Sequence, residues 1–269
     1  LVADDRVDGV TFTGSVDVGQ GIRDAVTARN GRVQLELGGH NPCLVFGDAD
    51  LEVAVAGVVG GAMGATGQKC TATRRIIAVG DVHDELVDRL VAAVSALRIG
   101  DGQDPETAIG PLVSAGARSE VAEAVDQAKA EGAETVAVAE GTPDGPCYFP
   151  PTLFVGDTDL TITREEVFGP VSTVLRVEDE DEAFTLANDT DFGLSASVYT
   201  DDPWIVDRAV HELRAGLIKV NGPTTGSEIH APFGGEKDSS GHAPREQGDT
   251  AQEFFTRTRT AYVKPGRPR

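Results

Sequence analysis

Residues 33–46 read VQLELGGHNPCLVF. The first five alternate between apolar and polar side chains, which is the period of a half-buried strand, and the Gly-Gly pair ends it. The run 43–46 is short and continuously apolar, so it indicates a second, buried strand. Asp50 then stands at an N-cap position before an Ala- and Val-rich helix predicted over 51–65.

Strands and helices are predicted to alternate in both directions along the chain from this stretch. Further strands are predicted at 9–13, 75–79, 135–138, 172–177, 195–199, 216–220 and Thr258 to Lys264. Further helices are predicted at 17–29, 83–97, 114–131, 181–188, 203–213 and 247–255. Strands that alternate with helices are typical of an α/β layered fold with a largely parallel sheet.

The composition is strongly acidic. The 269 residues include 44 Asp and Glu against 23 Lys and Arg, which gives a formal net charge of −21. Such a surface repels nucleic acid and anionic lipid, so neither is an expected partner. No apolar run approaches the roughly 20 residues that span a bilayer, and the first residues show no signal-peptide pattern.

The acidic residues are dispersed along the chain, as at 48–50, 178–182 and 201–202. An ordinary acidic enzyme is one interpretation, and a halophile's protein, kept hydrated in concentrated salt by its carboxylates, is the other. We favour the second as a hypothesis. We therefore expect the protein to unfold as salt is withdrawn, which circular dichroism across a salt titration would measure. Full stability in low salt would contradict the hypothesis.

The cysteines and histidines indicate the compartment of the protein and whether it holds a metal site. The cysteines are three in number and widely spaced: Cys43, Cys70 and Cys147. This pattern argues against a disulfide framework and favours the reducing cytoplasm. The five histidines are scattered without ligand spacing, so no metal site is predicted: His40, His83, His211, His230 and His242.

Glu36 and Cys70 are the two candidate catalytic residues. Glu36 ends an apolar strand just before a Gly-Gly turn, where desolvation would raise the pKa of its carboxyl group toward that of a general base. Cys70 lies in GATGQKCT, residues 64–71, whose glycines let backbone approach a substrate. Lys69 would favour the thiolate if its ammonium lies near the sulfur. The structural alternatives are a strand-end ion pair for Glu36 and a small buried apolar residue for Cys70.

Three other stretches contain candidate residues for binding a small molecule. A strand ends at Gly14-Ser15 and a helix follows, so backbone N–H groups and a helix dipole could face a phosphate. Residues 164–170 read REEVFGP, in which Glu166 suits a ribose diol and Phe168 a planar ring. The turn APFGG can project Phe233 into a neighbouring cleft. Each stretch also has a purely structural reading, as a common α/β junction or a solvated loop.

Taken together, these stretches resemble the C-terminal half or so of a non-phosphorylating aldehyde dehydrogenase. They occur in the same order as in that family and at similar separations. The resemblance covers essentially the whole chain. It implies that Cys70 is the nucleophile and Glu36 the general base, that the Cys70 backbone N–H helps to stabilise the oxyanion, and that Phe233 contacts the aldehyde. It implies a bound NAD or NADP, close to these residues: Gly14, Ser15, Gly19, Leu37, Glu166 and Phe168.

The implied reaction turns an aldehyde into a carboxylate. The Cys70 thiolate attacks the aldehyde carbon, a hydride passes to NAD(P)⁺, and Glu36 activates the water that hydrolyses the resulting thioester. Residues 67–73, 237–240 and 245–248 look most like the 2,5-dioxovalerate (α-ketoglutarate semialdehyde) branch of the family. The expected product is then 2-oxoglutarate.

The resemblance also implies a domain organisation. We expect a remnant of a Rossmann-like dinucleotide-binding domain over 1–38, a catalytic thiol domain with a parallel-rich sheet over 39–245, and a C-terminal helix and oligomerisation strand over 246–269. The expected partner is a second copy, in a homodimer or homotetramer. The family's N-terminal segment, which reads the 2′ position of the cofactor, is not in this sequence, so NAD and NADP both stay open.

Three interpretations of the chain therefore stand. It is a partial sequence of an active aldehyde dehydrogenase, or a truncated non-catalytic domain that acts as an assembly partner, or a thiol esterase that needs no cofactor. Reduction of NAD(P)⁺ separates the first interpretation from the other two. Release of product from an activated ester separates the last two from each other.

Overall fold

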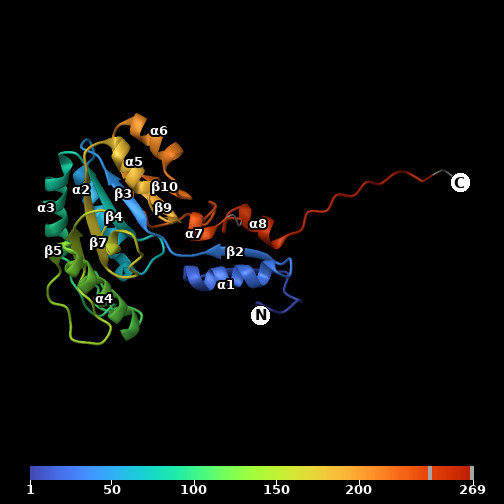
Figure 1. The fold of residues 1–269 in the computed structure, drawn as a ribbon, viewed down its shortest axis with the longest axis horizontal. Helices are drawn as coiled ribbons and strands as arrows, with labels where there is room; N and C mark the ends of the chain where they lie inside the picture. Colours follow the sequence, from blue (N-terminus) through green and yellow to red (C-terminus); the bar gives the residue numbers. More distant parts are fainter. Residues whose placement is uncertain (242–243, 267–269) are drawn as a thin grey trace.

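A computed structural model describes residues 1–241 and 244–266, and its strands form two sheets (Figure 1). The small sheet pairs β1 (Gly9–Thr13) with β2 (Arg32–Glu36) in parallel. The large sheet has seven strands in the order β10-β9-β3-β4-β7-β6-β5. Their bounds are β3 (Asn41–Val45), β4 (Thr73–Val79), β5 (Glu134–Val138), β6 (Thr152–Val155), β7 (Val171–Val177), β9 (Ser195–Tyr199) and β10 (Leu217–Val220).

The predicted α/β class with a largely parallel sheet is confirmed. Every neighbouring pair in the large sheet is parallel except β5 with β6, which is antiparallel. The helices are α1 (Val16–Thr27), α2 (Leu51–Met63), α3 (Val82–Ser95), α4 (Ala115–Glu131), α5 (Glu180–Asn188), α6 (Pro203–Glu212), α7 (Lys237–Ser240) and α8 (Thr250–Phe255). The short elements are the 3₁₀ turns η1 (Gly64–Gly67) and η2 (Thr161–Thr163) and the strand β8 (Phe192–Gly193).

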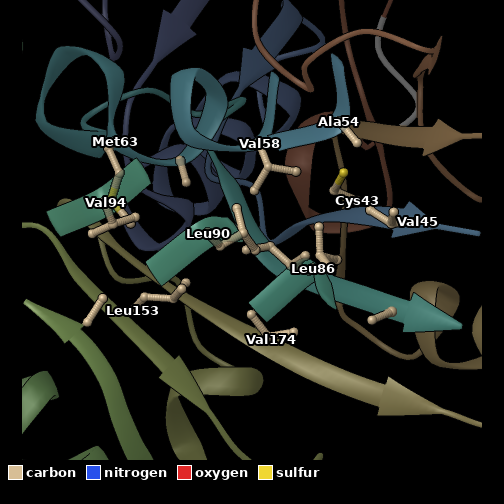
Figure 2. Packing of buried hydrophobic residues seen from close by; sticks show 14 of the residues in the cluster. Cys43, Val45, Ala54, Val58, Met63, Leu86, Leu90, Val94, Leu153 and Val174 are labelled. Carbon is tan, nitrogen blue, oxygen red and sulfur yellow. The ribbon is translucent and has the colours of Figure 1, made fainter. Parts of the chain in front are cut away.

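The main core lies between the large sheet and the helices α2 and α3. Figure 2 shows Val58 of α2 and Leu86 and Leu90 of α3 turned toward Cys43 and Val45 of β3. A second apolar cluster, which includes Phe184 and Ala209, packs α5 and α6 with the same sheet. Since both clusters contain residues of β3, this strand has helices on each side, which explains its continuous apolar sequence.

Local signals placed most elements well. The Asp50 side chain accepts hydrogen bonds from the N–H groups of Glu52 at 3.0 Å and Val53 at 3.2 Å, which confirms the predicted N-cap of α2. Sequence reasoning missed β6, because its strand signal directly follows a stretch rich in Pro and Gly. No helix among the described residues is long and apolar enough to cross a bilayer.

The C-terminal end differs from the prediction. Helix α8 starts three residues later than the predicted 247, and residues 256–266 form no strand, so the strand predicted over Thr258 to Lys264 is wrong for this structure. The segment runs away from the rest of the chain (Figure 1), where no neighbouring backbone is at hand to pair with it. Tyr262 is 93% exposed and Val263 is 86% exposed.

The connection between the two sheets positions the site. Strand β2 ends at Glu36 and β3 begins at Asn41, so only residues 37–40 separate the carboxyl end of the small sheet from the amino end of the large one. The turn before β4, which carries Cys70, reaches the same place because β4 pairs with β3. Residues from both sheets therefore meet at this junction.

Candidate active site

A cleft of about 710 Å³ opens at the junction of the two sheets. All the predicted site residues except Gly19 and Glu36 line it: Gly14, Ser15, Leu37, Cys70, Glu166, Phe168 and Phe233. These residues come from distant parts of the chain, and the fold brings them to one cavity. The predicted grouping of the site is thus present in the described residues, with Glu36 behind the wall of the cleft.

The turn at Gly14 and Ser15 has the expected form. Strand β1 ends at Thr13, and Ser15 is the N-cap of α1 without a capping bond from its side chain. The Gly14 N–H donates to the Glu36 carbonyl at 3.1 Å, which ties the turn to β2. The N–H groups of the first helical turn have no intrahelical acceptors, so they suit an anionic group at the cleft.

Glu36 is a buried carboxylic acid. It is 2% exposed, and neither of its carboxyl oxygens has a hydrogen-bond partner among the described residues. Burial raises the pKa of Glu36 to about 8. The nearby Ser240 hydroxyl, outside strict hydrogen-bond geometry, opposes this shift, the Glu246 carboxylate adds to it, and the Arg245 guanidinium opposes it. A Cβ on Gly234 would lie 2.6 Å from Glu36 Oε1, so only glycine fits against the acid there. The predicted burial of Glu36 is confirmed.

Ser239 holds the backbone that follows Glu36. Its carbonyl accepts from the Leu37 N–H at 2.7 Å, and its hydroxyl donates to the Gly38 carbonyl at 2.7 Å. The same hydroxyl accepts from the Gly193 N–H at 3.0 Å. Sequence reasoning missed this function of Ser239, although the residue lies in a stretch that supported the family resemblance. Its neighbours along the chain give no sign of partners so far away.

Cys70 is half-buried in the wall of the cleft. Burial raises the pKa of its thiol, the Glu166 and Glu36 carboxylates add to the rise, and the backbone N–H groups of Cys70 and Thr71 oppose it. Lys69 is exposed and is not among the charges that act on the sulfur. Lys69 nevertheless lines the same cleft as Cys70, so the suggestion that it favours the thiolate stays a prediction.

Asn41 fixes the peptide groups that follow Cys70. Its Nδ2 donates to the carbonyls of Cys70 and Ala72, both at 2.8 Å, and its Oδ1 accepts from the Ser195 N–H at 3.0 Å. Thr224 completes the support by donating from its hydroxyl to the Thr71 carbonyl at 2.7 Å. These buried polar groups satisfy backbone that a loop would otherwise leave unpaired. Sequence reasoning missed both residues.

Glu166 and Phe168 form the opposite wall. Burial raises the pKa of Glu166, while the Gly39 N–H, at 3.1 Å from Oε1, and the Arg74 guanidinium oppose the rise. Its Oε2 lies so close to Gly38 that a side chain there would collide with it. Phe168 is 45% exposed beside the acid. An acceptor carboxylate and an open aromatic face fit the ribose and ring of a nicotinamide cofactor.

Phe233 is held at the remaining edge of the cleft. Its N–H donates to the Glu246 carbonyl and its carbonyl accepts from the Glu246 N–H, each at 2.7 Å. Among residues 1–241 and 244–266, no group of three His, Cys, Asp or Glu side chains is arranged to hold a metal ion. His242, one of the five histidines considered above, lies outside the described residues.

Comparison with known proteins agrees with this geometry. Residues 1–261 match the model of the aldehyde dehydrogenase family. The chain is 45% identical to an α-ketoglutarate semialdehyde dehydrogenase of Haloferax volcanii and covers 55% of it, with 97% of the chain aligned. It is 39% identical to a 2,5-dioxopentanoate dehydrogenase of Saccharolobus solfataricus, again with 97% of the chain and 55% of the relative aligned.

Solved structures give the same result. An NAD-dependent aldehyde dehydrogenase from Sinorhizobium meliloti superposes with a TM-score of 0.94 at 35% identity, covering 100% of this chain and 53% of that one. A betaine aldehyde dehydrogenase from Staphylococcus aureus in complex with NAD⁺ superposes with a TM-score of 0.89 at 34% identity, covering 94% and 51%. The chain thus spans about half the length of the relatives that it matches.

Proposed function

Because the chain belongs to the aldehyde dehydrogenase family, we propose that this protein oxidises an aldehyde to a carboxylate with NAD or NADP, through a thioester on Cys70. The observation that carries the proposal is the shared cleft, which Cys70, Glu166 and Phe168 line together. Glu36 lies behind its wall, and burial raises the pKa of Glu36 to about 8. The nicotinamide cofactor, when bound, supplies the hydride acceptor. Glu166 and Phe168 would hold its ribose and ring.

The remaining chemistry belongs to the chain's own residues. After the Cys70 thiol has lost its proton, its sulfur forms a bond to the aldehyde carbon, and the N–H groups of Cys70 and Thr71, which point toward the sulfur, are placed to stabilise the adjacent oxyanion. Departure of a hydride leaves a thioester. The ionised form of Glu36 then takes a proton from water, whose oxygen attacks the thioester carbon. The carbon–sulfur bond breaks, the carboxylate leaves, and a proton returns to the sulfur to regenerate the thiol.

We propose 2,5-dioxovalerate as the substrate. Its support is the naming of relatives that are 45%, 40% and 39% identical. Relatives named betaine aldehyde dehydrogenase, at 40% identity, make betaine aldehyde the competing substrate. The test is an assay of the protein from its source, with each aldehyde and with both NAD⁺ and NADP⁺. Absence of any cofactor reduction would refute the proposed function, and a preference for betaine aldehyde would refute the substrate.

The intact mass of the isolated protein comes first among these measurements. A mass about twice that of this 28.1 kDa chain would favour the partial sequence of an active enzyme, because the relatives are about twice as long. A mass equal to that of the chain would favour the truncated domain.

The domain bounds 1–38, 39–245 and 246–269, the cytoplasmic location and the origin in a salt-loving organism also stay proposals. The Haloferax volcanii relative supports the last.

We also propose a homodimer or homotetramer. The support is the segment 256–266, which forms no strand within its own chain and exposes the strand-favouring residues Tyr262 and Val263. Light scattering coupled to size-exclusion chromatography would measure the assembly. A monomer in concentrated salt would contradict the proposal.

Changing Glu166 to glutamine is expected to weaken cofactor binding. The amide keeps the shape but loses the charge that strengthens hydrogen bonds to a diol, so we expect the KM for the cofactor to rise about 10- to 100-fold. Steady-state kinetics would measure it. Cleavage of an activated ester, which needs no cofactor, serves as the control and should stay near the wild-type rate. An unchanged KM would show that Glu166 does not hold the ribose.

A further inference from the structure

One buried charge beside the cleft has no part in the reaction proposed above. Arg74, the second residue of β4, is 3% exposed, and burial lowers its pKa to about 10. Its guanidinium donates only to backbone carbonyls, and its Nε has no partner among the described residues. A buried cation without a hydrogen-bonded carboxylate is costly, because its desolvation is not offset by a paired charge. Such a cost calls for a compensating function.

The first carbonyl that Arg74 binds belongs to the nucleophile loop, residues 64–70. Here Ala65, Thr66 and Gly67 have positive φ angles of 52°, 56° and 64°. Left-handed backbone is unfavourable for Ala and Thr, and such a run persists only where the surroundings impose it. Arg74 Nη2 donates to the carbonyl of Gly67, at the end of this run and three positions before Cys70. The guanidinium thereby supports the approach to the nucleophile.

The second carbonyl belongs to the cofactor loop, residues 166–169. Arg74 Nη1 donates to the Gly169 carbonyl at 2.6 Å, directly after Phe168. The two loops touch at this point, because a Cβ on Gly67 would collide with the Gly169 carbonyl. The Arg74 backbone is itself fixed, since the Ser172 hydroxyl of β7 donates to its carbonyl at 3.0 Å. The planar Arg74 guanidinium therefore joins the loop that carries the nucleophile to the loop that carries the cofactor-binding residues.

We propose that Arg74 is a positioning residue that couples the nucleophile loop to the cofactor loop and serves as the counter-charge of Glu166. The planar guanidinium sets the spacing between the loops, because its two Nη groups reach one carbonyl in each. Its charge favours the ionised form of Glu166 without a direct hydrogen bond, since the Arg74 guanidinium donates to the two carbonyls instead. This inference rests on the proposed function for the part that concerns the cofactor.

The chain offers a matched control in the next residue. Arg75 is also buried, at 1% exposed, and burial also lowers its pKa to about 10. It points the other way and donates to the carbonyls of His40, Leu186 and Ala187. A change at Arg75 therefore disturbs an equally buried guanidinium without touching either loop.

The experiment compares Arg74→Lys, Arg74→Met and Arg75→Lys in the complete protein, with folding checked by circular dichroism. Iodoacetamide labelling of Cys70 is followed by peptide mass spectrometry, with Cys147 as the internal reference. Both Arg74 variants should speed Cys70 labelling by about fivefold or more, because the loosened loop exposes the thiol. Arg75→Lys should leave it within about twofold. Unchanged labelling in Arg74→Lys, or an equal increase in Arg75→Lys, would overturn the coupling.

Measuring cofactor affinity distinguishes the effect of the Arg74 charge from the effect of its hydrogen bonds to the two loops. Titration with NAD⁺ and NADP⁺ should show binding weakened about tenfold in Arg74→Met and restored to within about threefold in Arg74→Lys, which keeps the charge. Equal weakening in both variants would remove the counter-charge from the proposal. If Arg74→Met does not fold, hydrogen exchange of the unmodified protein decides: cofactor binding should protect both loops, and protection of residues 166–169 alone would overturn the coupling.

The outcomes also stay distinct from those of the proposed function. A protein that binds and reduces neither cofactor would refute the dehydrogenase proposal. The labelling of Cys70 in the Arg74 and Arg75 variants would still report whether the guanidinium holds the nucleophile loop.

Discussion

Replacement of Cys70 by alanine is expected to abolish aldehyde oxidation. The sulfur forms the only covalent bond to the substrate in the proposed reaction, so its loss removes the pathway and does not merely slow it. We expect a fall of about 10⁴-fold or more in kcat/KM, measured by NAD(P)H formation. The release of nitrophenol from an activated ester should vanish in the same variant, because the acyl group has no thiol to receive it.

The matched control is Cys147→Ala. Cys147 is half-buried like Cys70, but it lies outside the cleft, so this variant should keep oxidation and the ester burst near wild type. Ester cleavage without cofactor reduction in the wild-type protein would favour the thiol esterase. Neither activity in the wild-type protein would leave the assembly partner as the better interpretation. Appreciable oxidation by Cys70→Ala would remove this cysteine from the mechanism.

The sequence reveals those site residues whose local context is unusual. Glu36 ends an alternating strand before two glycines, and this pattern alone predicts a carboxyl group at the edge of a buried layer. Cys70 is marked by the glycines around it. Such local patterns also gave Asp50 as a cap and most of the strands, because period and capping are properties of neighbouring residues.

Residues that act through distant partners could not be found in this way. Asn41 reaches Cys70 across 29 positions, and Arg74 reaches Gly169 across 95. In the sequence, each is only a polar residue at the start of a strand. Their function depends on the parallel pairing of β3 with β4 and of β4 with β7, which places these loops side by side. Pairing partners in a parallel sheet are set by packing and not by the adjoining residues.

The C-terminal prediction failed for a related reason. The segment Thr258 to Lys264 was predicted as a strand, yet a strand forms only where a second backbone supplies hydrogen bonds. The missing information was the position of that neighbouring backbone.

Replacement of Glu36 by glutamine is expected to separate the two halves of the reaction. Formation of the thioester and of the first NAD(P)H needs only the ionised fraction of the Cys70 thiol, which grows as pH rises because the pKa of this thiol is raised. A single burst should therefore remain in alkaline buffer. Hydrolysis needs the base, so steady-state turnover should fall about 10²- to 10⁴-fold. Rapid-mixing kinetics would measure both phases. Loss of the burst together with turnover would place Glu36 in the first half of the reaction.

The pH dependence of the same variant tests the buried acid. Glu36 can act as a base only when ionised, and its pKa of about 8 means that wild-type hydrolysis should rise with pH up to about 8. Glu36→Gln should lack this rise. A wild-type profile that is already flat above pH 5 would show that the carboxyl group is not held protonated, and would contradict the effect of burial.

Stability should respond to pH with the opposite sign. Below the ordinary pKa of 4.5 the carboxyl group is protonated in both states, and between 4.5 and about 8 only the unfolded chain gives up its proton. Wild-type stability therefore falls across this window, and above it the penalty is fully present. Relative to Glu36→Gln, we expect a loss of about 2–5 kcal/mol, the lower figure reflecting water in the adjoining cleft. Denaturant unfolding of both proteins at pH 5 and pH 9 would measure the difference. Parallel curves would show that Glu36 is solvated in the folded protein and that its burial does not prepare it as a base.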